Sequence, residues 1–251
     1  MAGPIAMLLR LLATLAALSF AAAPAAAQQA SAGGLYGHIP YGEADAATLV
    51  DAPAGFAQGQ RCRVQPAMLA DLSRLIAAAR TANPRSELRG LSCYRTIGHQ
   101  DRVFCEAGQP GRPCVDPARR AESVAPPGFS EHGTGYAIDF GARPETGCPD
   151  LDPCFASTAV GRWLLANAPF YGFELSFPQG NGQGVTWEPW HWRWVGVSAA
   201  EPGARAARAV FANARRRFPA RPRVPAVVVR VMSQPPVPTD SATAAPATPS
   251  P

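Results

Sequence analysis

A histidine and an aspartate lie close together in the stretch SEHGTGYAIDF, residues 130–140. The two glycines between His132 and Asp139 permit tight turning, and YAIDF has the alternation and the apolar content of a buried strand. An aspartate within such a strand is costly if it is buried without a partner. A bound cation would remove that cost, and so would an ion pair with an arginine or a side chain that faces solvent.

A further histidine, His191, lies in the segment TWEPWHWRWVG. A catalytic zinc ion commonly takes three protein ligands from His, Asp or Glu and keeps another position open for water. His132, Asp139 and His191 would supply two neutral imidazoles and one carboxylate. A zinc ion held in this way keeps a net positive charge, which helps it acidify water and polarise a carbonyl.

Glu188 precedes His191 by three residues. In a regular strand the two side chains would point to opposite faces, but Pro189 cannot join a hydrogen-bonded ladder and marks a break that could turn Glu188 toward the metal. A carboxylate there can take a proton from water and pass it to a leaving amine. The alternative is a surface carboxylate that caps or pairs.

The residues around His191 also alternate as a strand would. Three tryptophans share one face and His191 shares the other with two further residues; the members are Trp190, Trp192 and Trp194 on the first face and His191, Arg193 and Val195 on the second. We therefore expect the tryptophans in the core and His191 turned away from them.

Three segments resemble the signatures of the VanY-type zinc D-alanyl-D-alanine carboxypeptidases, peptidase family M15. SEHGTGYAID resembles SxHxxGxAxD, EPWHWRWVG resembles the ExWH segment, and SCYRTIGHQ, residues 92–100, is similar to SGYRSxxxQ. The resemblance runs from about residue 66 to residue 197, in the order of the family. The wider group includes D-Ala-D-Ala dipeptidases and shares its metal site with the hedgehog signalling domain.

The resemblance implies that His132, Asp139 and His191 bind one zinc ion and that Glu188 is the catalytic base and acid. It also implies that Arg95 holds the substrate and stabilises the oxyanion. A guanidinium can form paired hydrogen bonds with a carboxylate or a developing oxyanion, which agrees with that role. The alternative for Arg95 is a structural salt bridge.

The resemblance further implies that Gln100 and Ser130 contact the end of the peptide substrate. The alternatives are an amide on a helix surface for Gln100 and a loop or capping hydroxyl for Ser130. For His99 we expect a surface position or a place behind the metal ligands, and His38 is expected to be unrelated to catalysis.

The elements expected to position these residues mix helices and strands without regular alternation, which indicates an α+β fold. Met68, Leu72, Leu75 and Ala79 recur at helical spacing in a helix that begins near Pro66 and ends at Asn83. Further helices are predicted at 96–106, 116–124 and 157–167, and strands at 87–95, 136–141, 173–178 and around His191. The resemblance implies a single hedgehog/DD-peptidase-like domain in which helices flank a small antiparallel sheet.

Six cysteines, an even number, favour disulfides in an exported protein. Their spacings contain no CxxC pair, which disfavours a structural zinc-thiolate site. About 15 pairings are formally open. Local loop closure favours Cys105 with Cys114 and Cys148 with Cys154, which leaves Cys62 for Cys93. Cys93 stands where the family has glycine, which suggests a bridge that tethers the loop carrying Arg95.

The chain divides into five regions by composition. Residues 1–27 have the charged start, apolar stretch and Ala-rich end of a signal peptide, which predicts a periplasmic or secreted protein. Residues 28–60 form an irregular N-terminal arm and 61–200 the catalytic domain. Residues 201–217 form a basic helix, and 218–251 a Pro/Ala-rich tail expected to be largely disordered.

The net charge of +5 is concentrated near the C-terminus, because residues 201–230 contain eight arginines and one glutamate. The rest of the chain is therefore close to neutral, and nothing in it resembles a nucleic-acid reader. The basic segment is either a solvated helix face or a weak contact for an anionic envelope component. We expect a monomer.

The candidate site together with the resemblance to the VanY-type carboxypeptidases predicts a zinc peptidase that removes the terminal D-alanine from peptidoglycan stem peptides. Alternatives with the same site are an L,D-carboxypeptidase, a D-Ala-D-Ala dipeptidase and a peptidoglycan endopeptidase. A rival of another class is a non-catalytic, metal-stabilised module that binds the cell wall. Glu188 argues against that rival, since binding alone needs no general base.

Overall fold

A four-stranded antiparallel sheet forms the centre of the domain. The computed structural model describes residues 34–105, 114–144 and 147–225. Its sheet has the order β3 (Glu87–Ser92), β4 (Ala137–Arg143), β6 (His191–Trp194) and β5 (Phe173–Leu175). A separate two-stranded sheet pairs β1 (Val50–Asp51) with β2 (Arg63–Val64). The signal peptide predicted for 1–27 lies outside the described residues.

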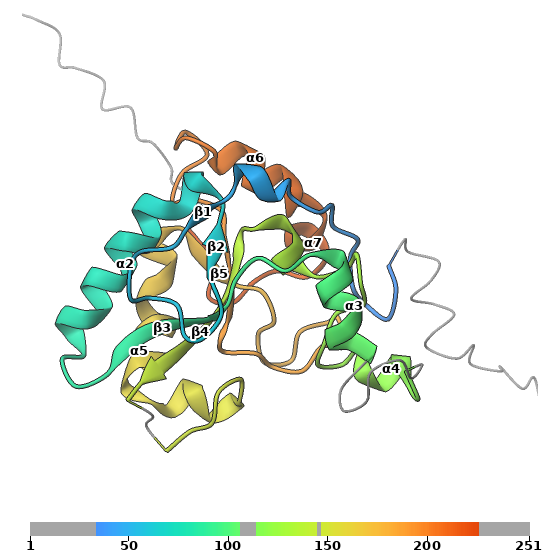
Figure 1. Cartoon of the computed structure of the whole chain (residues 1–251), viewed down its shortest axis with the longest axis horizontal. Coiled ribbons are helices and arrows are strands. Elements are labelled where there is room, and N and C mark those ends of the chain that lie inside the picture. The colour runs from blue at the N-terminus through green and yellow to red at the C-terminus, as the bar shows by residue number, and fades with distance from the viewer. Residues whose placement is uncertain (1–33, 106–113, 145–146, 226–251) are drawn as a thin grey trace, which may run out of the picture.

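The helices lie around this central sheet, as Figure 1 shows. They are α2 (Leu69–Ala82), α3 (Ile97–Cys105), α4 (Pro117–Arg120), α5 (Ala159–Asn167), α6 (Ala204–Val210) and α7 (Ala212–Arg217). Strands and helices follow no regular alternation, so the α+β class and the small antiparallel sheet are confirmed. Among the described residues, every helix is too short or too polar to span a membrane.

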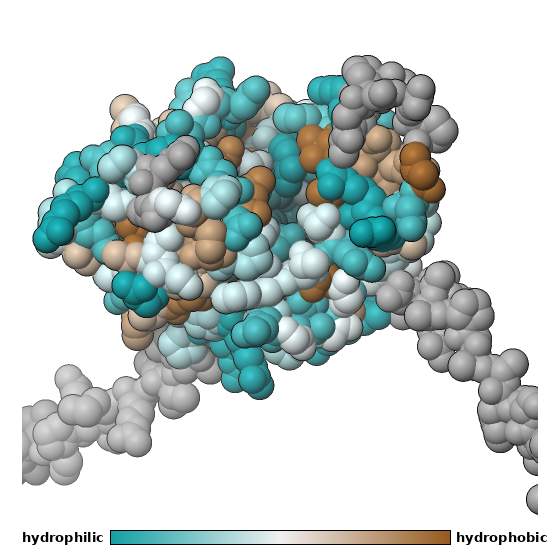
Figure 2. Space-filling view, turned by 90° about the horizontal axis from the view of Figure 1, so that it is seen from below, coloured by the Kyte–Doolittle hydropathy of each residue, from teal (hydrophilic) through white to brown (hydrophobic). Residues whose placement is uncertain are grey.

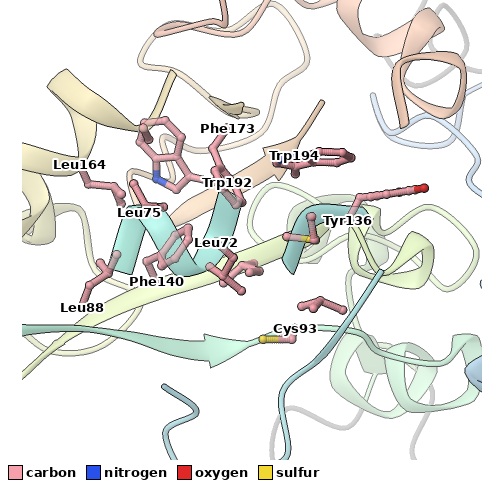
Figure 3. Packing of buried hydrophobic residues seen from close by; sticks show 14 of the residues in the cluster. Leu72, Leu75, Leu88, Cys93, Tyr136, Phe140, Leu164, Phe173, Trp192 and Trp194 are labelled. Carbon is pink, nitrogen blue, oxygen red and sulfur yellow. The ribbon is translucent and has the colours of Figure 1, made fainter. Parts of the chain in front are cut away.

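Helix α2 buries Leu72, Leu75 and Ala79 at the predicted spacing. It ends where predicted, since the amide and the backbone N–H of Asn83 both donate to the carbonyl of Ala79. The buried leucines pack toward the strands, where Figure 3 shows them near Trp192, Phe140 and Phe173. This packing holds the sheet that carries two of the three metal-binding candidates, Asp139 and His191.

Strand β6 separates apolar from charged side chains. Trp192 and Trp194 are fully buried in the core, and Trp194 stacks on Tyr136 with a centroid distance of 5.9 Å. The indole nitrogen of Trp194 donates to Asp71 Oδ2 at 2.7 Å, so its polar atom is satisfied. The intervening residues, His191 and Arg193, contact carboxylates instead, as the alternation predicted.

All three predicted disulfides are present in the structure. Cys62 pairs with Cys93, Cys105 with Cys114, and Cys148 with Cys154. The first bridge ties the segment before β2 to the chain that leaves β3. It therefore fixes the backbone two residues before Arg95.

The C-terminal region differs from the prediction. The single helix expected at 201–217 is two short helices that meet at Phe211, which is fully buried in the core. Residues 218–225, assigned to the tail, pack on the domain: Ala220 and Val224 are buried, and the carbonyl of Pro222 accepts from the Leu175 N–H at 3.0 Å. This Pro-rich segment packs on the domain through two small apolar side chains and a backbone hydrogen bond to the edge strand β5. The remainder, 226–251, lies outside the described residues.

Candidate metal centre

Three elements bring His132, Asp139 and His191 together. His132 lies in a 3-10 helix, Glu131–Thr134, in which the His132 N–H donates to the capping Ser130 hydroxyl and whose end is turned by Gly135 at φ 72°. Asp139 lies in the middle of β4, directly opposite His191, the first residue of β6. Strand register therefore joins residues far apart in the sequence.

The three side chains offer a compact set of donor atoms, all within 4.8 Å of one another and all buried. His191 Nδ1 lies 2.9 Å from Asp139 Oδ1, and His132 Nε2 lies 3.1 Å from Asp139 Oδ2. His132 Nδ1 donates to the Cys93 carbonyl at 2.7 Å, which leaves the Nε2 lone pair facing the other two ligands. That Nε2 is buried without a hydrogen-bond partner. Two imidazoles and one carboxylate with an unmatched nitrogen fit a catalytic zinc ion.

Behind His191 lies a group of polar residues joined by hydrogen bonds, here called the inner side and consisting of Tyr41, Glu131, Glu174 and Arg193. Glu131 Oε2 lies 3.1 Å from His191 Nε2, and Glu131 Oε1 accepts from Arg193 at 2.8 Å and from the Tyr41 hydroxyl at 3.1 Å. Arg193 also donates to Glu174 at 3.0 Å. A carboxylate on the far nitrogen of a histidine fixes its ring and leaves Nδ1 for the metal.

The charges of the inner side favour a cation between Asp139 and Glu131. Burial alone would raise the pKa of Glu131, but Arg193 and His191 hold it well below its usual range. Burial alone would lower the pKa of His191, but Asp139 and Glu131 raise it to about 10. The pKa of His132 falls to about 4 through burial and the nearby Arg95. His132 is therefore neutral, whereas the carboxylates on both sides of His191 favour a positive charge there.

Two further charged residues lie close to the ligands, Glu188 and Arg95, and are here called the cavity side. Glu188 is buried, with Oε2 3.9 Å from His191 Nδ1, and burial raises its pKa to about 8, to which Asp139 contributes. The chain turns before β6, since the His191 N–H donates to the Glu188 carbonyl at 3.0 Å. The break expected at Pro189 thus turns Glu188 to the same side as His191.

Arg95 is half-buried and carries an unmatched charge. Its Nε is buried without a hydrogen-bond partner, and among the described residues no carboxylate forms an ion pair with it. Burial lowers its pKa, and Asp139 and Glu188 oppose that shift. The structural salt bridge considered as an alternative for Arg95 is therefore absent from the described part of the chain.

Arg95 and Glu188 line a cavity of about 530 Å³ that also exposes the three metal-binding candidates. Figure 2 views the molecule from below, where this face is hollowed on the side of α3 and α4. Other lining residues come from α4, from the loop closed by the Cys148–Cys154 disulfide and from the loop before β6; among them are Arg120, Leu151 and Trp187. This volume is within the range of small-ligand sites.

The remaining candidates from the sequence occupy different places. Ser130 lines the cavity, whereas Gln100 is buried, does not line it, and donates to the Ala125 carbonyl at 2.6 Å. His99 is exposed. His38 lies nearer to the site than expected: it lines the cavity wall, and its Nε2 lies 2.7 Å from the Ala121 carbonyl.

Sequence reasoning did not identify Glu131 and Tyr41. Glu131 stands beside His132 in SEHG, but its contacts reach to Tyr41, Ser176 and Arg193, which are distant in the sequence. The alternation of β6 placed Arg193 on the face of His191 and was the one available signal. A buried arginine beside a metal ligand calls for a carboxylate partner.

The buried His₂Asp donor set beside a cavity is of the kind found in metal-dependent hydrolases. Comparison with known families makes this specific: residues 61–197 match the family model VanY, D-alanyl-D-alanine carboxypeptidase. The chain belongs to the VanY family of D-alanyl-D-alanine carboxypeptidases.

Two relatives and one solved structure illustrate the similarity. A putative carboxypeptidase, YodJ, of Bacillus subtilis (strain 168) is 39% identical over 46% of this chain and 41% of its own length. The bifunctional D-Ala-D-Ala dipeptidase and carboxypeptidase VanXYC of Enterococcus gallinarum is 30% identical over 53% of this chain and 68% of its own length. The LD-carboxypeptidase LdcB superposes with a TM-score of 0.52 and 28% identity, covering 70% of this chain and 77% of that one.

Proposed function

We propose that this protein is a zinc-dependent D-alanyl-D-alanine carboxypeptidase that removes the terminal D-alanine from peptidoglycan stem peptides. The observation that carries the proposal is the joint placement of the His132, Asp139 and His191 donor atoms with Glu188 at one cavity. Family membership supplies the substrate class. Glu188 separates this function from a non-catalytic binding module, which would have no use for a buried carboxyl group beside the ligands at the cavity.

His132, Asp139 and His191 would hold the zinc ion, which supplies a Lewis acid for the scissile carbonyl and lowers the pKa of water. The Glu188 carboxylate accepts a proton from the attacking water as the new C–O bond forms. It then delivers that proton to the nitrogen of the departing D-alanine as the C–N bond breaks. Arg95 donates to the oxyanion that develops on the carbonyl oxygen.

The cavity also suits a peptide ligand that carries a carboxylate. Arg95 and Arg120 line it and provide cationic donors, and the Ser130 hydroxyl offers a further polar contact. We propose that Ser130 contacts the end of the substrate. For Gln100 we propose an indirect contribution through the Ala125 carbonyl, since its side chain is directed there.

A second candidate function is L,D-carboxypeptidase activity on stem peptides that have already lost one D-alanine. The similarity to the LD-carboxypeptidase LdcB favours it. Both reactions use the same metal ligands, base and oxyanion donor, so the difference lies in the residues that accept the side chain before the scissile bond.

We also propose that the protein acts outside the cytoplasmic membrane, because its substrate lies there and residues 1–27 read as a signal peptide. Three disulfides are consistent with an oxidising compartment. Mass measurement of the mature exported protein checks this, and cleavage after Ala27 is the expected result.

The function is tested by incubating the purified protein with pentapeptide and tetrapeptide stems and identifying the products by mass. Release of one D-alanine from the pentapeptide is expected, with loss of activity after chelation and recovery on addition of zinc. Release from the tetrapeptide instead would assign the L,D activity. Release of the dipeptide D-Ala-D-Ala, or activity that survives complete metal removal, would contradict the proposal.

A further inference from the structure

A second pocket, of about 330 Å³, is built from the C-terminal elements and shares no lining residue with the metal-site cavity. Its charged lining residues are Glu174 on β5 and four arginines, Arg208, Arg215, Arg216 and Arg223. All four arginines lie beyond the residues that match the family model, 61–197. This arginine pocket is therefore an addition to the matched domain.

The fold, and not sequence adjacency alone, brings these arginines together. After α7 the chain runs beside β5, where the Pro222 carbonyl accepts from the Leu175 N–H at 3.0 Å. Ala220 and Val224 are buried on either side of that contact. Arg223 is thereby held at the same pocket as Arg208 of α6 and Arg215 of α7. Figure 1 shows the helices α6 and α7 next to each other.

The pocket holds more positive than negative charge. Among the described residues that line it, Glu174 is the one carboxylate, and it already accepts from Arg193 and from Arg215 at 3.0 Å each. Arg193 is fully buried, so its charge depends on Glu174 and Glu131 for compensation. Little of the Glu174 charge is left to balance the other arginines.

Several guanidinium groups keep free donors at the pocket. Arg208 uses Nε and Nη2 on the carbonyls of Val195 and Gly196, which fixes its position and leaves Nη1. Arg216 and Arg223 are exposed, and within the described chain neither forms an ion pair with a carboxylate. Burial lowers the pKa of Arg208, and the nearby Arg215 adds to that shift.

We propose that the arginine pocket binds a phosphate group. A phosphate would offset the repulsion among the arginines, and its oxygens match the paired N–H donors of guanidinium groups. The exposed position of Arg216 and Arg223 makes the pocket accessible to a phosphate on a lipid headgroup as well as to a soluble phosphate. This site is independent of the proposed peptidase reaction and can fail or succeed without it.

The test is calorimetric titration of the full chain with inorganic phosphate at constant ionic strength. Arg216→Ala/Arg223→Ala removes two exposed arginines of the pocket, and Arg85→Ala/Arg205→Ala is a charge-matched control, since both of its residues are exposed and lie outside the pocket. Affinity is expected to fall at least about ten-fold in the pocket variant, as for the loss of charge-assisted hydrogen bonds, and to stay unchanged in the control. Any phosphate bound at the metal site contributes equally to all three proteins.

Sedimentation with phosphatidylglycerol or phosphatidylcholine vesicles identifies the source of the phosphate. Binding to the anionic vesicles that the pocket variant loses would assign a lipid headgroup, whereas phosphate affinity without vesicle binding would assign a soluble phosphate. Equal phosphate affinity in the wild type and the pocket variant would overturn the proposal. So would the absence of phosphate binding by the wild type.

Discussion

The two sides of the metal site treat buried charge in opposite ways. On the inner side, Arg193 is matched by Glu131 and Glu174, and Glu131 is matched again by Tyr41 and His191. On the cavity side, Arg95 forms no ion pair within the described chain, and Glu188 has a raised pKa of about 8. Charged groups that are paired with one another fix the orientation of a metal ligand. Charged groups without a protein partner can instead bind a substrate or a metal ion.

This contrast predicts that Arg193 contributes more to the free energy of unfolding than the other charged residues around the metal ligands. Arg193→Met would leave the charges of Glu131 and Glu174 buried with less compensation, and loss of one partner of a buried pair costs about 3–5 kcal/mol. Urea unfolding of the metal-free protein measures the effect. A variant as stable as the wild type would show that the inner side contributes no net stability.

Arg95 is the matched comparison, because it is the other arginine beside the ligands. Arg95→Met removes a charge without an ion-pair partner, so the unfolding free energy should change little. Turnover should fall by about 10²–10³, as for the loss of an oxyanion donor. If the variant unfolds easily but its surviving folded fraction retains full turnover, Arg95 is a structural residue.

The link between the inner side and the metal is tested at Glu131. Glu131→Gln keeps the volume and weakens the hydrogen bond that orients His191, so zinc affinity should fall by about 10–100-fold. Competition with a chromophoric chelator measures this, with Glu174→Gln as a control one residue further from the ligand. Equal losses in the two variants would indicate general destabilisation and not positioning.

The smallest effect is expected at Tyr41, which lies in the N-terminal arm outside the family match. Tyr41→Phe removes one hydrogen bond to Glu131 and should cost about 1 kcal/mol of unfolding free energy. Turnover should be nearly unchanged, since Glu131 keeps its contacts with Arg193 and His191. A large loss of bound zinc would show that the N-terminal arm is needed to position the metal ligands.

The metal ligands and Glu188 were more accessible to sequence reasoning than the inner side. His132, Asp139, Glu188 and His191 lie in two short segments whose residue types suggest metal chemistry, and the structure brings them together. The strand alternation around His191 and the disulfide pairing also followed from local spacing, and both are confirmed.

The inner side depends on contacts that no local pattern encodes. Tyr41 reaches Glu131 from the arm, and Glu174 reaches Arg193 across the pairing of β5 with β6. The packing of residues 218–225 on β5 has the same origin, since an open strand edge can hold a segment whose composition alone argues for disorder. Tertiary placement decided both outcomes.

Zinc content and turnover measured side by side in the wild type and Glu188→Gln test the central claim most directly. Glu188 is not one of the three ligands, so the variant should bind as much zinc as the wild type. Its release of D-alanine should fall by about 10²–10⁴, as for the loss of a general base. A variant that keeps both its zinc and its full turnover would contradict the assignment of Glu188 and the division between the two sides.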